Sequence, residues 1–510
     1  MTRFSLLGTA SLAALVLAAP LHADVTADDI WGDWQSYMTS FGYEMTGTET
    51  RSGNTLTVSA VSMSFDMSGE GDPVGVVTMT MPAMTFTENG DGTVSVGMPG
   101  ESEIVFVSAE GAPEAVRAVI SYSQPGFAMT ASGAPNAVDY VYSADRMAMA
   151  LTELTVEGET LPAEALTAEM AIAGVSGQTA LRIDGLRRYD QTLSYEAVTL
   201  TFDFTDPDGD ESGKVNFAAE GMRFAGVSTI PDIDLGAEIV TALQAGFAVD
   251  GGFSLTGSSS DLAFTGPDAF TANTSADTTE YRIAMAADGG LVYDITHSGV
   301  ALNMLVPDFP LPITAQMASS AFKLALPVVK SDDPQDFGLT IEMNELEVAE
   351  GLWGMFDPAA QLPRDPATLQ VSIDGLAKLL FNFLDPAEAE AIGASGAMPA
   401  ELQSVNLGNL VLSAAGAALT GNGAFTVTPG LSPIFGPLGT PVGQVDLELV
   451  GGNGLMDKLV AMGLLPEEQA MGARMMMGLF ARPGEGADTL TSTIEINADG
   501  HILANGQRIQ

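Results

Sequence analysis

The amino-acid sequence predicts a mainly β protein of the α+β class, built as an elongated, twisted antiparallel sheet or meander with a few packed helices. Apolar and polar residues alternate in many segments, for example at Val77, Met79 and Met81, and this pattern is typical of a strand with one apolar face. Turns rich in Asp, Asn and Gly separate the segments. In the first half of the chain no helical pattern lies between them, so we expect neighbouring strands to pair antiparallel.

The beginning of the chain has the pattern of a secretory signal peptide over residues 1–23. Arg3 supplies the positive charge, residues 4–19 are mostly apolar, and the small residue Ala23 precedes the expected cleavage site. Later segments do not approach the roughly eighteen consecutive apolar residues of a spanning helix. We therefore expect a periplasmic or secreted protein with no membrane-spanning segment after signal cleavage.

Composition limits the class of protein. The chain has no Cys, and 46% of its residues are hydrophobic, so an exported protein of this length is expected to rely on a packed core and not on disulfides. The formal net charge is −47. Because so acidic a surface repels phosphate groups, we exclude DNA and RNA as partners.

A helix is expected directly after the signal peptide. Thr26 is a suitable cap, Asp28 and Asp29 fall in the first turn, and Gly42 marks the end. Between them, apolar residues recur at helical spacing, including two of the three Trp residues. This helix is expected either to pack across a sheet or to act as a lid or interfacial anchor.

The remaining chain is divided into two β regions, residues 24–232 with the opening helix and residues 233–510 with interspersed helices. In the first region, alternation changes phase near Ala60 and Val61, which predicts a bulge, and a long hairpin is expected around residues 206–212. In the second region, helical spacing predicts helices over 233–247, 351–356 and 376–384, and composition predicts a flexible loop over 387–400.

The last stretch, residues 442–510, has the pattern of a strand, two helices and a hairpin. The hairpin is expected to turn at Asp499-Gly500, so that Ile496 faces Leu503. Residues 410–425 resemble it, since Gly416 matches Gly500 and Asn422-Gly423 matches Asn505-Gly506. Two interpretations stay open: a repeated unit, or turns that recur in any Gly-rich antiparallel sheet.

No residue is predicted to be catalytic. The two histidines after the signal peptide, His297 and His501, are far apart in the sequence and fall in expected strands. Ser320 and Lys323 form an S-x-x-K pattern, but the Ser-Asp-Asn and Lys-Thr-Gly motifs that accompany it in penicillin-recognising enzymes are absent from the sequence. A pair of carboxylates could serve a glycosidase, yet no motif distinguishes any pair among 65 acidic residues.

A weak metal site is suggested by Asp206, Asp208 and Asp210, whose alternate carboxylates could converge on Ca²⁺. No other cofactor is expected. The segment departs from an EF-hand loop, because Glu211 stands where Gly is needed and Phe217 where the bidentate Glu should be. The alternative interpretation is a solvated hairpin turn.

Methionine is unusually frequent, with 26 residues, and many lie in strand stripes. Met fills cores and also lines adaptable apolar grooves. One stripe predicts an apolar ligand groove if the sheet is left uncovered, and otherwise part of the core; its residues are Met63, Phe65, Met67, Met79, Met81, Met84 and Phe86.

The signal peptide, the opening helix with its Trp residues, the Met- and Thr-rich strands and the ending with Asp499-Gly500 and Asn505-Gly506 resemble an exported bacterial family known as domain of unknown function 2125. The resemblance covers most of the chain after residue 23 and implies no catalytic residues. More loosely, the closing hairpin is similar to hairpins of AsmA-like envelope proteins, which are associated with lipid handling, although this chain lacks their membrane anchor.

These observations predict a non-enzymatic protein that binds or carries an apolar, lipid-like ligand in envelope maintenance. A structural or adhesive β scaffold, with or without Ca²⁺, is the first alternative, and a carboxylate-dependent hydrolase is the second. The sequence identifies no protein partner.

Overall fold

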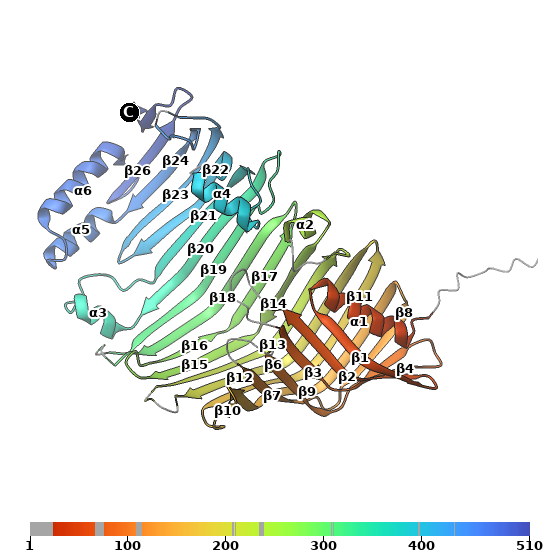
Figure 1. The fold of residues 1–510 in the computed structure, drawn as a ribbon. Helices are drawn as coiled ribbons and strands as arrows, with labels where there is room; N and C mark the ends of the chain where they lie inside the picture. Colours follow the sequence, from red (N-terminus) through yellow and green to blue (C-terminus); the bar gives the residue numbers. More distant parts are fainter. Residues whose placement is uncertain are drawn as a thin grey trace, which may run out of the picture.

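The computed structural model describes residues 24–510 except 67–75, 109–114, 207, 208, 210, 234–238, 308, 310, 396, 397 and 433. The expected signal peptide therefore lies outside the described residues. The described chain is mostly strand and forms one large antiparallel sheet. Figure 1 shows this sheet as an elongated, twisted array with α1 at one end and α5 and α6 at the other.

The helices are α1 (Ala27–Ser40), α2 (Ile239–Gln244), α3 (Glu350–Phe356), α4 (Pro386–Ser395), α5 (Gly452–Ala461) and α6 (Glu467–Phe480). Within the described part of the chain, no helix combines the length and apolar character needed to cross a membrane.

The strands of the first half are β1 (Glu44–Ser52), β2 (Thr55–Asp66), β3 (Val76–Met81), β4 (Met84–Glu88), β5 (Val94–Gly97), β6 (Glu101–Ser108), β7 (Val116–Ser123), β8 (Ala128–Ala134), β9 (Ala137–Val156), β10 (Glu159–Thr160), β11 (Leu166–Asp184), β12 (Leu186–Thr205), β13 (Ser212–Ile230), β14 (Ala248–Leu255) and β15 (Gly257–Thr265).

Those of the second half are β16 (Phe270–Ala276), β17 (Thr278–Ala286), β18 (Gly290–Leu305), β19 (Ile313–Leu326), β20 (Gln335–Val348), β21 (Ala367–Leu379), β22 (Ala400–Ala414), β23 (Ala417–Thr428), β24 (Thr440–Val450), β25 (Arg482–Pro483), β26 (Thr489–Ile496), β27 (Ile502–Ala504) and β28 (Gln507–Arg508).

The order of strands in the sheet follows the order of the chain. In several places two consecutive short strands together take the place of one long strand. β3 and β4 both pair with β2, and β14 and β15 both pair with β13. From β18 to β24 each strand pairs with the next by simple antiparallel ladders. The ladder from β13 to β14 also crosses the boundary expected after residue 232, so the sheet is continuous there.

Many of the long strands bend at one left-handed residue near the middle. Its φ is +48° at Ala60, +61° at Gly174, +58° at Gly221, +59° at Gly299 and +54° at Glu345. Apolar positions on the two sides of the bend are three residues apart and not two, so alternation changes phase while the apolar side chains stay on one side. In β2 the bend confirms the bulge predicted near Ala60, and both Val58 and Val61 are fully buried in one core.

The main core lies at the amino-terminal end, where the first strands curl around α1 (Figure 1). Thr26 caps the helix as predicted, and Asp29 in the first turn completes a capping box: the Asp29 N–H donates to the Thr26 hydroxyl over 3.2 Å, and the Thr26 N–H donates to the Asp29 carboxylate over 2.9 Å. Ile30 and Trp31 are buried beneath this helix, and Trp34 meets Phe86 edge to face at 5.5 Å. These contacts agree with the interpretation of this helix as one that packs across the sheet.

Other predicted elements also appear. β12 and β13 form the long hairpin around residues 206–211, α3 matches the helix predicted over 351–356, and β24, α5 and α6 occur in the predicted order. The helix predicted over 233–247 is described only as α2, since residues 234–238 lie outside the described set.

Two predictions about helices are wrong. Residues 376–379 extend β21 because they pair with β20 and β22, so no helix covers the described residues 376–384. The expected loop at 387–400 begins with α4, since the Asp385 carboxylate accepts the backbone N–H groups of Ala387 and Glu388 and caps the helix. Pro386 directly follows this cap, and a proline at the first helical position favours the start of a helix.

The closing hairpin is wider than predicted. Ile496 faces Ile502, not Leu503, because the side chain of Asn497 accepts the N–H groups of Asp499 and His501 and enlarges the turn. The earlier segment turns tightly at Ala415 and Gly416, with φ of +52° and +83°. Asn422 and Gly423 continue β23 and make no turn, so the described geometry does not support a repeated unit.

Candidate ligand-binding surface

One face of the sheet carries two continuous rows of mostly apolar side chains. Residues directly opposite each other in an antiparallel ladder share a face, so each row can be followed through the pairings. The first row consists of Tyr142, Gly177, Leu193, Phe224, Phe253, Tyr281, Ile295, Phe322, Ile341, Val371, Leu410, Gly421 and Leu447.

The second row runs beside the first. It consists of Tyr140, Thr179, Gln191, Gly226, Gly251, Ile283, Tyr293, Leu324, Leu339, Ile373, Leu407, Gly423, Val445 and Ile494. Ring contacts join the rows, since Tyr281 stacks on Phe253 at 5.0 Å and meets Tyr293 at 5.3 Å. We call this side of the sheet the apolar face.

Part of the apolar face is open to solvent, and most of the rest is half-buried. Ile283 is 39% exposed, Phe322 37% and Ile341 36%. Nearer the other edge of the sheet, Leu200 and Phe202 are 40% and 38% exposed. Contiguous exposed apolar surface of this kind typically marks a binding site.

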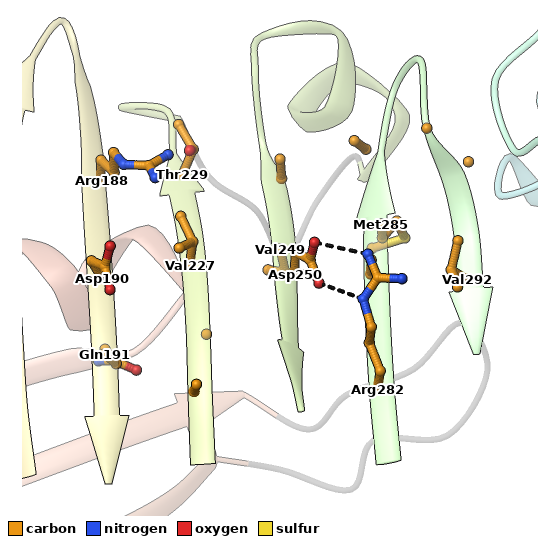
Figure 2. A pocket seen from close by; sticks show the side chains of 17 residues that line it. Arg188, Asp190, Gln191, Val227, Thr229, Val249, Asp250, Arg282, Met285 and Val292 are labelled. Carbon is orange, nitrogen blue, oxygen red and sulfur yellow. Dashed lines mark hydrogen bonds and ion pairs between the residues drawn. The ribbon is translucent and has the colours of Figure 1, made fainter. Parts of the chain in front are cut away.

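The opposite face is polar and charged. Asp250 accepts two hydrogen bonds from Arg282, each of 2.9 Å, and Lys323 lies 3.4 Å from Asp294. An open hollow of about 680 Å³ lies on this side, lined by residues of β12, β13, β14, β17 and β18. Figure 2 shows the side chains that line it. Two basic and two acidic residues line the hollow, namely Arg188, Arg282, Asp190 and Asp250, so their formal charges balance.

The apolar face ends under α1 in a cavity of about 330 Å³, which we call the α1 pocket. Both rows enter it, through Tyr140 and Tyr142. The helix supplies Asp33, Trp34 and Tyr37, and Tyr37 meets Tyr189 edge to face at 5.2 Å. The Tyr142 ring lies over Gly177, where an added Cβ would come within 2.5 Å of it.

At the far end of the rows, an apolar cleft of about 510 Å³ lies between α6 and the sheet, and we call it the α6 cleft. Leu447 of the first row and Ile494 of the second line it, together with Met476 and Phe480. Met471, Met475 and Leu479 on α6 point away, with exposed fractions of 64%, 73% and 59%. The open part of the apolar face therefore lies between two helix-bounded cavities.

The residues of the predicted Met groove are only partly open. Met63 pairs with Met79, and Met81 pairs with Val61, so all three belong to strands at the start of the same sheet and are half-buried. Met84 and Phe86 are 4% and 0% exposed. These two are a correction to the predicted groove, because α1 covers them and makes them core. Met67 and the side chain of Phe65 lie outside the described residues.

The predicted Ca²⁺ site stays a prediction. Asp206 lies in the turn between β12 and β13, where its N–H donates to the Glu211 carbonyl over 2.9 Å, but Asp208 and Asp210 lie outside the described residues. Among the residues that are described, no cluster of three His, Cys, Asp or Glu side chains could hold a metal.

Ser320 and Lys323 do not form a nucleophile and base. They lie three residues apart on the regular strand β19, where Ser320 pairs with His297 and Lys323 pairs with Asp294. Side chains three apart on a strand point to opposite faces. His297 itself contacts the Thr279 hydroxyl through Nδ1 at 2.9 Å.

Sequence reasoning missed the α1 pocket. Tyr140 and Tyr142 have the alternate spacing that puts two side chains on one face, and this signal was available. Nothing local to the sequence connects them with Tyr189 or Asp33, which the tertiary fold brings to the same cavity.

Residues 226–504 match a family described as "Uncharacterized protein conserved in bacteria (DUF2125)". The chain belongs to the DUF2125 family. The matched residues begin in β13 and end with β27, so the resemblance to this family is confirmed over slightly more than half of the chain and not over most of it. The α1 pocket lies outside the matched part. No curated protein and no solved structure matched the chain.

Proposed function

We propose that this DUF2125 protein binds an elongated apolar molecule, a lipid-like ligand, along its apolar face and catalyses no reaction. The observation that supports this most directly is the pair of rows, which stay mostly apolar from the α1 pocket to the α6 cleft and are half-buried or exposed over most of that length. Leaving so much apolar surface in water is unfavourable, and covering it with a ligand would remove that cost.

The dimensions of the face favour a long, thin ligand. Adjacent strands are about 4.8 Å apart, so rows that cross from β9 to β24 extend over roughly 55 Å. Larger side chains lean over several glycines of the rows, as Tyr142 does over Gly177 and Leu447 over Gly421, so the apolar surface is continuous there. A hydrocarbon chain fits such a surface without needing hydrogen-bond partners.

The compartment belongs to the same proposal. Residues 1–23 have the pattern of a signal peptide, which would export the protein to the periplasm. We propose that it serves there in envelope maintenance, where hydrocarbon chains must cross an aqueous space.

Native mass spectrometry of the protein purified without detergent tests the proposal first. A stoichiometric adduct that is extracted as lipid is the expected result. A clean ligand-free mass, together with no uptake of added lipid, would contradict ligand binding and leave the sheet as a structural scaffold.

Substitutions on the two sides of one strand then locate the site. Ile341→Asp places a charge in the first row, and burying that carboxylate against hydrocarbon is expected to weaken lipid binding by about tenfold or more. Thr340→Asp is the matched control, since Thr340 is the next residue and faces the polar side. Equal effects of the two variants, both checked for folding by circular dichroism, would argue against the apolar face.

A further inference from the structure

The α1 pocket differs from the rest of the apolar face because it contains polar groups. Asp33, Thr179 and Gln191 line it, and so do the hydroxyl-bearing side chains of Tyr140 and Tyr189. A cavity that combines an apolar body with a few convergent polar atoms is typical of a small-molecule site.

Two of those polar groups lack an acceptor for their protons. Tyr140 and Tyr189 are each only 6% exposed, and neither hydroxyl has a partner in close hydrogen-bond geometry. The groups beside them, Trp34 at Tyr140 and Arg187 at Tyr189, can only donate, so neither can accept a hydroxyl proton. A buried hydroxyl without an acceptor is destabilising, so a ligand atom that accepts both protons would stabilise the two hydroxyls.

The charges beside the cavity select the kind of acceptor. Arg187 forms an ion pair with Asp33, and the two side chains are only 20% and 10% exposed. Because these charges neutralise each other, no cation is left over to balance a phosphate or a carboxylate. Burial also raises the pKa of both tyrosine hydroxyls, which keeps them protonated as donors.

We infer that the α1 pocket binds the uncharged, hydrogen-bond-accepting head of a long-chain lipid, with an ester carbonyl between the Tyr140 and Tyr189 hydroxyls and the hydrocarbon chain on the two apolar rows. This inference rests on the proposed function and adds the class of ligand and its direction. The cavity of about 330 Å³ is large enough for such a head, and the rows begin at its lining residues Tyr140 and Tyr142.

Two probes separate the head from the chain. Diphenylhexatriene is a hydrocarbon fluorophore without a hydrogen-bonding group, and a monoacylglycerol that displaces it carries both a chain and an ester head. Tyr140→Phe and Tyr189→Phe each remove one hydroxyl and keep the ring. Each is expected to weaken monoacylglycerol binding about fivefold, and the double variant about twentyfold, while diphenylhexatriene binding stays unchanged.

Tyr122→Phe is the matched control, because Tyr122 lies in neither row and outside the α1 pocket, and its hydroxyl donates to Gln124 over 2.7 Å; it is expected to change neither affinity. Unchanged monoacylglycerol affinity in the double variant, or an equal loss in Tyr122→Phe, would overturn this inference and leave the binding face intact. If the wild-type protein binds neither probe, both the proposed function and this inference are overturned.

Discussion

The Asp33–Arg187 ion pair fixes α1 to β12 at the edge of the α1 pocket. Burial raises the pKa of the Asp33 carboxyl, and the opposing effect of Arg187 does not fully offset it. A carboxyl with a raised folded-state pKa contributes stability below its unfolded pKa, and this contribution is lost as pH rises through the folded value. The counter-charge of Arg187 limits that loss.

Arg187→Met is therefore expected to destabilise the protein by about 3–5 kcal/mol at neutral pH, because a buried charge is left unpaired. The loss should shrink as pH falls towards the unfolded pKa of about 3.9, where Asp33 is protonated. Urea unfolding of variant and wild type at several pH values measures this difference.

Arg282→Met is the control for that experiment. Arg282 and Asp250 form a bidentate pair, but their side chains are 52% and 56% exposed, so its loss should cost no more than about 1 kcal/mol. A loss of unfolding free energy in Arg187→Met that does not depend on pH, or that is as small as in the control, would contradict a buried Asp33 charge that needs Arg187.

At the scale of elements, the left-handed bend in the long strands keeps apolar side chains on one face of the sheet, although the alternation of apolar and polar positions shifts by one residue at the bend. Ile172 and Val175 flank Gly174 in β11, and Ala219 and Met222 flank Gly221 in β13. In the sequence alone, such a shift in the alternation of apolar and polar residues would predict that the strand ends there. Gly174 and Gly221 are both level with Glu196 of β12, and the two ladders keep the same register on either side of it, so pairing is preserved.

Gly174→Ala should destabilise the protein by about 1–2 kcal/mol. Its φ of +61° is unfavourable for a residue with a Cβ, and that atom would come 2.2 Å from Cγ of Glu196. Urea denaturation at constant m-value measures the change. Gly257→Ala is the control, since a Cβ there meets no atom within 4 Å and needs no positive φ; equal losses in the two variants would contradict a special role for the bend.

Helix boundaries show how far local signals reach. Thr26 as the cap predicted the start of α1 correctly, because capping is local chemistry. The same chemistry at Asp385 was available for α4 and was overlooked. Residues 376–379, by contrast, have helical spacing but join β21, because ladders on both sides outweigh local periodicity.

The whole molecule combines an apolar face with a strongly acidic composition. With 65 acidic and 18 basic residues, the net charge of −47 destabilises the compact state through self-repulsion. The exposed apolar rows add a second cost in water, which the proposed ligand would reduce. Net charge also keeps a protein with such a face soluble.

Added NaCl should therefore raise the thermal unfolding midpoint by a few degrees. The Debye length falls from about 30 Å at 0.01 M to about 3 Å at 1 M, so repulsion between surface carboxylates is screened over this range. Calorimetry across a salt series measures the midpoint. The rise should level off at high salt; a constant or falling midpoint would contradict the dominance of repulsion.

The sequence alone determined the β class, the meander, the capped opening helix and the acidic surface, because alternation, turn chemistry, capping and charge are properties of neighbouring residues or of composition. Only the tertiary structure decided how the strands align into two apolar rows, which part of that face α1 covers at Met84 and Phe86, and how Asp33, Tyr140 and Tyr189 meet in one pocket. Those features depend on the register between distant strands, and a shift of one residue would turn each side chain to the other face.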